Sequence, residues 1–86
     1  MAAHMRVAVI SPERTVFEGD ADMVVAPAWD GEVGVLRGHA PMLALLGDGE
    51  LRVRTSTGEQ RFRVRGGFLQ VADDVVTVLS EQADAT

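Results

Sequence analysis

The segment ELRVRTSTGEQRFRVR, residues 50–65, decides the fold class of this chain. Apolar residues alternate with arginines on both sides of a polar turn at residues 56–59. Because successive side chains of a strand point to opposite faces of a sheet, the alternation predicts a hairpin with one buried face and one face of five arginines. The buried positions are Leu51, Val53, Phe62 and Val64.

Short apolar and β-branched runs recur on both sides of this hairpin, each bounded by Gly, Pro, Asp or Ser. This punctuation is typical of an antiparallel β domain. No stretch has a helical period longer than two turns, so the strands need two layers or a flattened barrel to cover their apolar faces. The predicted strands are Arg6–Ile10, Thr15–Glu18, Ala21–Pro27, Gly34–Leu36, Leu43–Leu46, Glu50–Thr55, Gln60–Arg65, Phe68–Ala72 and Val75–Ser80.

The 86 residues form one small domain, which we place at residues 5–81. Residues 1–4, MAAH, look like a cloning scar before a natural start at Met5, and residues 82–86 are predicted to be a disordered tail. No cysteine is present, so disulfides and thiolate metal sites are excluded. The apolar runs are far shorter than a membrane-spanning helix needs, so we expect no direct membrane insertion.

The net charge of −5 comes from thirteen acidic residues against eight basic ones, all of them arginine. Nucleic acid would repel such a domain as a whole. The arginine face of the hairpin leaves three interpretations open: it is solvated or paired with acids, it meets an acidic protein partner, or it binds nucleic acid. The last is the weakest, since no aromatic residues lie between the arginines to stack on bases.

The chain has few side chains that could take part in catalysis. Outside residues 1–4 there is one histidine and no Lys, Cys or Tyr, and no serine has the setting of a nucleophile. We therefore predict no catalytic, cofactor-binding or metal site. The glycines at 31, 34 and 38 match no phosphate-binding loop and indicate turns with positive φ, whereas Gly66-Gly67 indicates a bend where a side chain would clash.

Three features of the middle of the chain stay open on these grounds. His39 is equally compatible with a loop histidine bonded to nearby backbone and with an interface role. Asp30 and Glu32 flank a turn, where acids are usually only solvated. Trp29, the sole tryptophan, either covers an edge of the core or meets a partner.

Several motifs occur together in a fixed order. They are VISPER at residues 9–14, FEG at 17–19, GEVGVLRGHAPMLALL at 31–46, GGFLQV at 66–71 and VTVL at 76–79. In this order and spacing the chain resembles, from Met5 to about Ala83, the epsilon subunit of bacterial and chloroplast rotary ATP synthases, called delta in mitochondria. The chain departs from the family pattern at two positions. Arg37 stands where the family usually has proline, and Trp29 is bulkier than the residue usually found at its position.

The resemblance implies a flattened antiparallel β-sandwich of about ten strands at the foot of the central stalk. Such a subunit is non-catalytic, binds the gamma subunit and the membrane c-ring, and couples ring rotation to ATP synthesis. It would lie on the cytoplasmic face of the bacterial cell membrane, held there through the complex. By family position the c-ring contacts are Glu32, Trp29 and Asp30, and the gamma contacts are Ser11, His39, Met42 and Ala44.

Family members commonly continue into a C-terminal helical hairpin that restrains ATP hydrolysis and in some cases binds ATP. This chain stops at Thr86, through either a short natural subunit or a truncation. We therefore expect no hairpin, no cofactor and no small-molecule ligand for the chain as it stands. The alternative hypothesis is a free-standing β-barrel module that uses the arginine-rich hairpin to bind an acidic protein or nucleic acid.

Overall fold

The computed structural model describes residues 4–86, and within that range it contains ten strands and no helix. The predicted all-β class is confirmed, as is the expectation of about ten short strands. In chain order the strands are β1 (Met5–Ile10), β2 (Thr15–Ala21), β3 (Met23–Ala28), β4 (Gly31–Leu36), β5 (Met42–Leu45), β6 (Asp48–Thr55), β7 (Gly58–Arg65), β8 (Phe68–Ala72), β9 (Val75–Leu79) and β10 (Gln82–Ala85).

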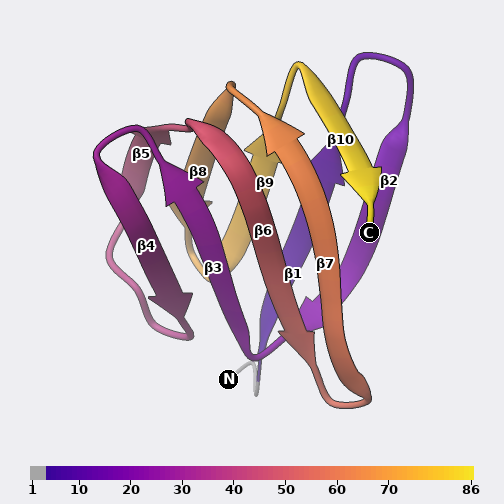
Figure 1. Ribbon diagram of the computed structural model, residues 1–86. Helices are drawn as coiled ribbons and strands as arrows, with labels where there is room; N and C mark the ends of the chain where they lie inside the picture. The colour runs from indigo at the N-terminus through magenta and orange to yellow at the C-terminus, as the bar shows by residue number, and fades with distance from the viewer. Residues whose placement is uncertain (1–3) are drawn as a thin grey trace.

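The strands form two five-stranded sheets that pack face to face (Figure 1). Sheet 1 has the order β2-β1-β9-β8-β5 and sheet 2 the order β10-β7-β6-β3-β4. Neighbouring strands are antiparallel except β1 and β9, which run parallel. The predicted hairpin is β6 and β7, with Leu51 opposite Phe62. The molecule is a flattened sandwich with extents of 32 × 25 × 20 Å.

The core lies between the sheets and is almost entirely aliphatic. Most strands contribute alternate residues to it, as the period of two requires. Phe62 on β7 and Phe17 on β2 meet with ring centroids 5.9 Å apart, which joins the β2 end of sheet 1 to sheet 2. The largest fully buried side chains are Met5, Leu51, Leu69, Val7, Val9, Val24, Val35, Val53, Val64, Val71, Val76 and Val78.

The chain crosses from sheet 2 to sheet 1 at Gly66 and Gly67, which have φ angles of 58° and 101°. A Cβ on Gly67 would overlap the carbonyl oxygen of Leu79. The predicted bend, and the reason for it, are therefore confirmed. Gly31 and Gly38 also have positive φ, as predicted, whereas Gly34 lies within β4 without it.

The buried residue Ser80, which follows β9, forms hydrogen bonds close to this bend. Its Oγ lies 3.1 Å from the backbone nitrogen of Arg65 on β7 and donates to the carbonyl oxygen of Gln82 on β10 at 2.7 Å. One hydroxyl thus connects the end of β9 to two strands of the opposite sheet, which satisfies its polar atom inside the sandwich.

The expectation of a disordered tail at residues 82–86 is wrong. Residues 82–85 form β10, which pairs with β7 so that Ala83 lies opposite Val64 and is only 5% exposed. Without β10, β7 would be an unpaired edge of sheet 2. The sequence offered little indication of this strand, because β10 buries only one small side chain, Ala83, among polar neighbours.

The suggested cloning scar falls largely outside the described residues, since residues 1–3 are not among them. His4 is described and is exposed, with its Nε2 atom 2.9 Å from Oδ2 of Asp20. Met5 begins β1 and is fully buried.

We expect Gly67→Ala to lower the free energy of unfolding by roughly 3 kcal/mol or more, because it combines a backbone clash with a left-handed conformation. Thermal and urea unfolding monitored by circular dichroism measure the change. Gly34→Ala is the matched control, since its Cβ would make only an ordinary contact, 3.5 Å from the methyl of Met23. A Gly67→Ala protein as stable as the Gly34→Ala protein would contradict this account.

We expect Ala83→Asp to destabilise the domain by about 3 kcal/mol, because it places a carboxylate against the core. Ala85→Asp, in the same strand but exposed, should change stability by less than about 0.5 kcal/mol. Equal effects of the two substitutions in urea unfolding would mean that β10 is not docked on β7 in solution.

Candidate docking surfaces

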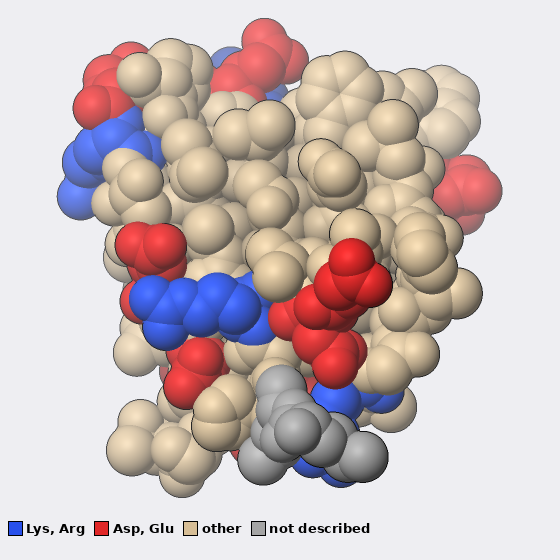
Figure 2. All heavy atoms as spheres, turned by 180° about the vertical axis from the view of Figure 1, so that it is seen from behind, with Lys and Arg blue, Asp and Glu red and all other residues tan. Residues whose placement is uncertain are grey.

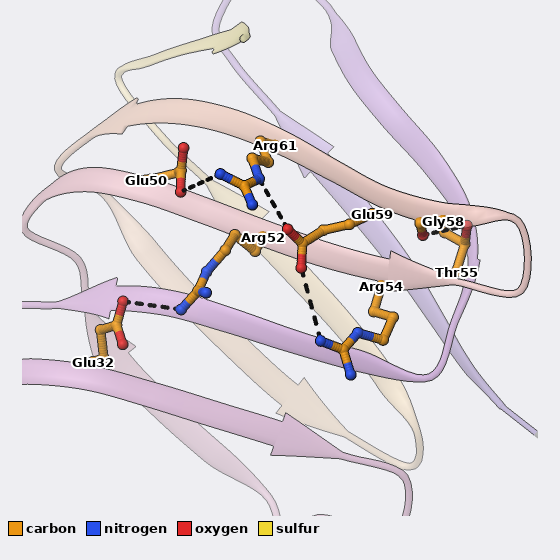
Figure 3. Close-up of polar contacts among 8 residues, drawn as sticks. All are labelled: Glu32, Glu50, Arg52, Arg54, Thr55, Gly58, Glu59 and Arg61. Carbon is orange, nitrogen blue, oxygen red and sulfur yellow. Dashed lines mark hydrogen bonds and ion pairs between the residues drawn. The ribbon is translucent and has the colours of Figure 1, made fainter.

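The outer face of sheet 2 carries the five arginines of the hairpin together with acids that pair with them (Figure 3). Glu59 bridges two arginines, one on its own strand and one on β6. The ion pairs are Arg52–Glu32 at 3.2 Å, Arg54–Glu59 at 3.9 Å, Arg61–Glu59 at 2.9 Å, Arg61–Glu50 at 3.8 Å and Arg65–Asp48 at 3.9 Å.

Strand register explains why most of the arginines lie near acidic side chains. β6 and β7 place Asp48 opposite Arg65, Glu50 opposite Arg63 and Arg54 opposite Glu59. Arg63 also lies opposite Asp84 of β10. Opposite charges across strands attract, so the arginine face is neutralised by its own sheet. Exposed pairs of this kind are worth little to stability, yet they remove the net positive stripe that an acidic partner or nucleic acid would need.

The outer face of sheet 1 is different in character. Figure 2 views this side of the molecule: uncharged side chains cover the centre of its upper half, with charged side chains at the edges and in a band below. Large apolar side chains that point to solvent here are Leu43, Leu45, Phe68, Val75 and Leu79, with exposed fractions from 46% to 69%. A surface that leaves so many large apolar groups in contact with water is typical of a site that another protein covers.

Three of these residues form one row across the strands together with the partly buried Ile10. Ile10 of β1 is opposite Leu79 of β9, Leu79 is opposite Phe68 of β8, and Phe68 is opposite Leu45 of β5. Residues directly opposite one another lie on the same face, so the four side chains are neighbours. We call Ile10, Leu79, Phe68 and Leu45 the apolar row.

A shallow, almost wholly apolar depression lies at the β1 end of the apolar row, with a volume of about 390 Å³. The depression is lined by Ile10, Ser11, Pro12, Gly67, Phe68, Leu79, Ser80 and Glu81.

The residues expected to contact gamma lie in or beside this face, but only part of each is exposed. Ser11 lines the depression while its hydroxyl donates to the carbonyl oxygen of Arg14 at 3.2 Å. Met42 and Ala44 of β5 are partly buried and pack against the core. Their neighbours Leu43 and Leu45 therefore present the exposed surface of β5, which alternation along the strand would have indicated.

His39 lies in the loop between β4 and β5, with Nδ1 2.7 Å from the carbonyl oxygen of Ala40. This agrees with the interpretation of a loop histidine bonded to nearby backbone. The same loop is tied to the β8–β9 turn by Asp74, whose Oδ1 accepts from the Gly38 N–H at 2.7 Å. That contact ties down the residue next to His39, and Asp74 was not among the residues that the sequence singled out.

The residues expected to contact the c-ring gather at one turn. Trp29 and Asp30 form the turn between β3 and β4, and Glu32 follows in β4, on the outer face of sheet 2. Trp29 is 78% exposed, so it does not cover an edge of the core. Glu32 is also exposed and pairs with Arg52.

No group of three or more acidic, histidine or cysteine side chains in residues 4–86 is arranged to hold a metal ion. Nor does this part of the chain contain a helix with the length and apolar character that crossing a membrane requires.

Residues 4–86 match the family model of the ATP synthase delta/epsilon chain β-sandwich domain. The chain belongs to this family. It is 52% identical over 79 residues to the ATP synthase epsilon chain of Rhodopirellula baltica, covering 92% of this chain and 62% of that one. Against the epsilon chain of Frankia casuarinae it is 49% identical over 83 residues, covering 95% and 98%. The chain thus spans less than two thirds of some curated relatives and nearly all of another.

Solved structures share the same sandwich. A chain of the mitochondrial ATP synthase of Euglena gracilis superposes with a TM-score of 0.91 at 24% identity, covering 99% of this chain and 55% of that one. A chain from Tetrahymena thermophila mitochondrial ATP synthase gives a TM-score of 0.79 at 18% identity, with coverage of 94% and 66%. At such identities the likeness establishes the fold.

Proposed function

We propose that this domain is a non-catalytic coupling module of a rotary, proton-translocating ATP synthase, docked on the gamma subunit and the c-ring so that ring rotation drives ATP synthesis. The proposal rests mainly on one observation. This chain belongs to the delta/epsilon family and exposes an apolar row on sheet 1, whereas the arginines on the outer face of sheet 2 are mostly paired with acids of that sheet. The apolar row and its depression are the surface that gamma covers.

The similar solved structures support a place beside the c-ring and central stalk. The similar Euglena chain comes from a structure of ATP synthase with its c-ring, and the Tetrahymena chain from one of the central stalk and c-ring. In this proposal the turn at Asp30 and the neighbouring Glu32 meet the polar loops of the ring. The domain then lies at the cytoplasmic face of a bacterial membrane, held there through the complex and without cofactor chemistry of its own.

The alternative of a free-standing module that uses the arginine face gains no support from the structure. Four of its five arginines make ion pairs with acids of the same sheet, and the remaining one, Arg63, lies opposite two acids. The net charge of −5 also disfavours both a nucleic acid and an acidic partner.

We expect Phe68→Asp to weaken the complex with the cognate gamma subunit roughly 30-fold or more, because it buries a carboxylate at an apolar contact. Isothermal titration calorimetry measures the affinity, and analytical ultracentrifugation confirms the complex. The matched control is Leu36→Asp, an apolar position on the outer face of sheet 2 that is 57% exposed against 46% for Phe68, and this variant should bind gamma as the original chain does. No complex of the original chain with gamma at micromolar concentrations would overturn the proposal.

We expect Glu32→Arg to weaken association with the c-ring and to lower proton-driven ATP synthesis in reconstituted vesicles, with the fold intact. The fold survives because the exposed Glu32–Arg52 pair contributes less than about 1 kcal/mol. Glu59→Arg is the control, since it makes the same charge change near the opposite end of the same face (Figure 3). Unchanged ATP synthesis in the Glu32→Arg complex would count against the ring contact.

A further inference from the structure

The turn between β8 and β9 consists of two aspartates in an uncommon backbone conformation. Among residues 4–86, only Asp73 and Asp74 combine a side chain with a positive φ, at 51° and 59°. Two successive residues with positive φ form the tight type I′ turn of a hairpin, in which glycine is favoured at the second position. Asp74 occupies that position, and a residue that goes against a local preference points to a role for its side chain.

Asp74 has such a role, whereas Asp73 does not. Oδ1 of Asp74 accepts a hydrogen bond from the backbone N–H of Gly38 at 2.7 Å, a short distance that is typical of a charged acceptor. The backbone carbonyl oxygen of Asp74 accepts from the N–H of Arg6 on β1 at 2.9 Å, so the turn itself is fixed to sheet 1. No hydrogen bond or ion pair between described residues involves the side chain of Asp73.

Gly38 belongs to a turn that its own sequence constrains only weakly. The N–H of His39 donates to the carbonyl oxygen of Leu36 at 3.1 Å, and Gly38, the third residue of this turn, has a φ of 82°. With no positive φ at Arg37, these values define a type II turn. Proline at the second position of such a turn would fix φ at about −65°, whereas arginine imposes no such restriction.

The loop at residues 37–41 leads directly into β5, the edge strand of sheet 1. This strand has only four residues and pairs with β8 alone. Its far end is fixed by the N–H of Leu46, which donates to the carbonyl oxygen of Gly67 at 2.9 Å. At its near end, the hydrogen bond between Asp74 and Gly38 ties the loop to the turn that follows β8. The strand is thus held on both sides of its short ladder.

We propose that Asp74 is a positioning residue of the gamma-facing surface. Its carboxylate holds the type II turn and the beginning of β5, so that Leu43 and Leu45, which are 69% and 57% exposed, are in place before gamma binds. The contact restricts the turn as a proline in place of Arg37 would. A loop that is ordered in advance loses less conformational entropy on binding, and this raises affinity. The inference rests on the proposed function, in which gamma covers this face.

Asp74→Gly tests this role, because it removes the carboxylate and glycine adopts a positive φ without strain. Asp73→Gly is the matched control: it makes the same change of charge at the other positive φ of the same turn, without loss of a side-chain contact. By isothermal titration calorimetry, we expect Asp74→Gly to weaken binding of the cognate gamma subunit about tenfold, since the loop must then be ordered on binding. Asp73→Gly should bind within about twofold of the original chain.

Two further variants distinguish positioning from a general effect on the fold. Asp74→Asn keeps an oxygen acceptor and tolerates a positive φ, so its affinity should stay within about threefold of the original. Arg37→Pro, added to Asp74→Gly, restricts the turn by another route and should recover about threefold of the loss. Urea unfolding of each variant verifies that the domain is folded.

Hydrogen exchange measured by NMR on the free domain reports the contact without gamma. The amide of Gly38 should exchange with solvent roughly tenfold faster in Asp74→Gly than in the original chain, because it loses its acceptor. The same amide should be unchanged in Asp73→Gly.

The outcomes separate this inference from the function on which it rests. Normal gamma affinity in Asp74→Gly would overturn the positioning role while the coupling function stands. An equal loss of affinity in Asp73→Gly, or equal exchange of the Gly38 amide in both variants, would also overturn it, because the contact would then not be what holds the turn. Failure of the original chain to bind gamma would remove the proposed function and this inference with it.

Discussion

The close approach of Gly67 to the carbonyl oxygen of Leu79 is the constraint on which the rest of the sandwich depends. At this point the chain leaves the charged hairpin and enters the other sheet, and only a residue without Cβ allows the two backbones to come so near. The hydroxyl of Ser80, one residue beyond Leu79, forms hydrogen bonds to the backbone of β7 and β10 at this bend. The bend sets the start of β8, and with it the register of Phe68 against Leu79 and Leu45.

That register gives the sandwich two outer faces of opposite chemistry. On sheet 2 the arginines of β6 and β7 are mostly paired with acids of the same sheet, so this face carries no net positive stripe. On sheet 1 the same period of two leaves leucine and phenylalanine side chains in water. An isolated soluble domain gains nothing from such exposure, whereas a subunit of an assembly buries it against a neighbour. The asymmetry between the faces is thus the physical basis for assigning one of them to a partner.

The region between β3 and β5 connects the two faces. Its turn at Trp29 follows β3 of sheet 2, yet the Ala28–Leu46 bridge brings it alongside β5 of sheet 1. Its loop at His39 is held by the contact between Gly38 and Asp74, a turn residue of sheet 1. Both segments therefore have fixed positions although neither lies within a regular strand.

Local patterns in the sequence determined the hairpin, its buried and polar faces, and the all-β class, because the period of a strand follows from backbone geometry alone. They also indicated the glycine bend, since two adjacent glycines report a backbone that side chains would obstruct. Tertiary structure alone decided which acid pairs with which arginine, that residues 82–85 close the edge of sheet 2, and that Trp29 aligns with Leu45. These features join residues far apart in the chain, so they depend on strand order and register, which no local pattern encodes.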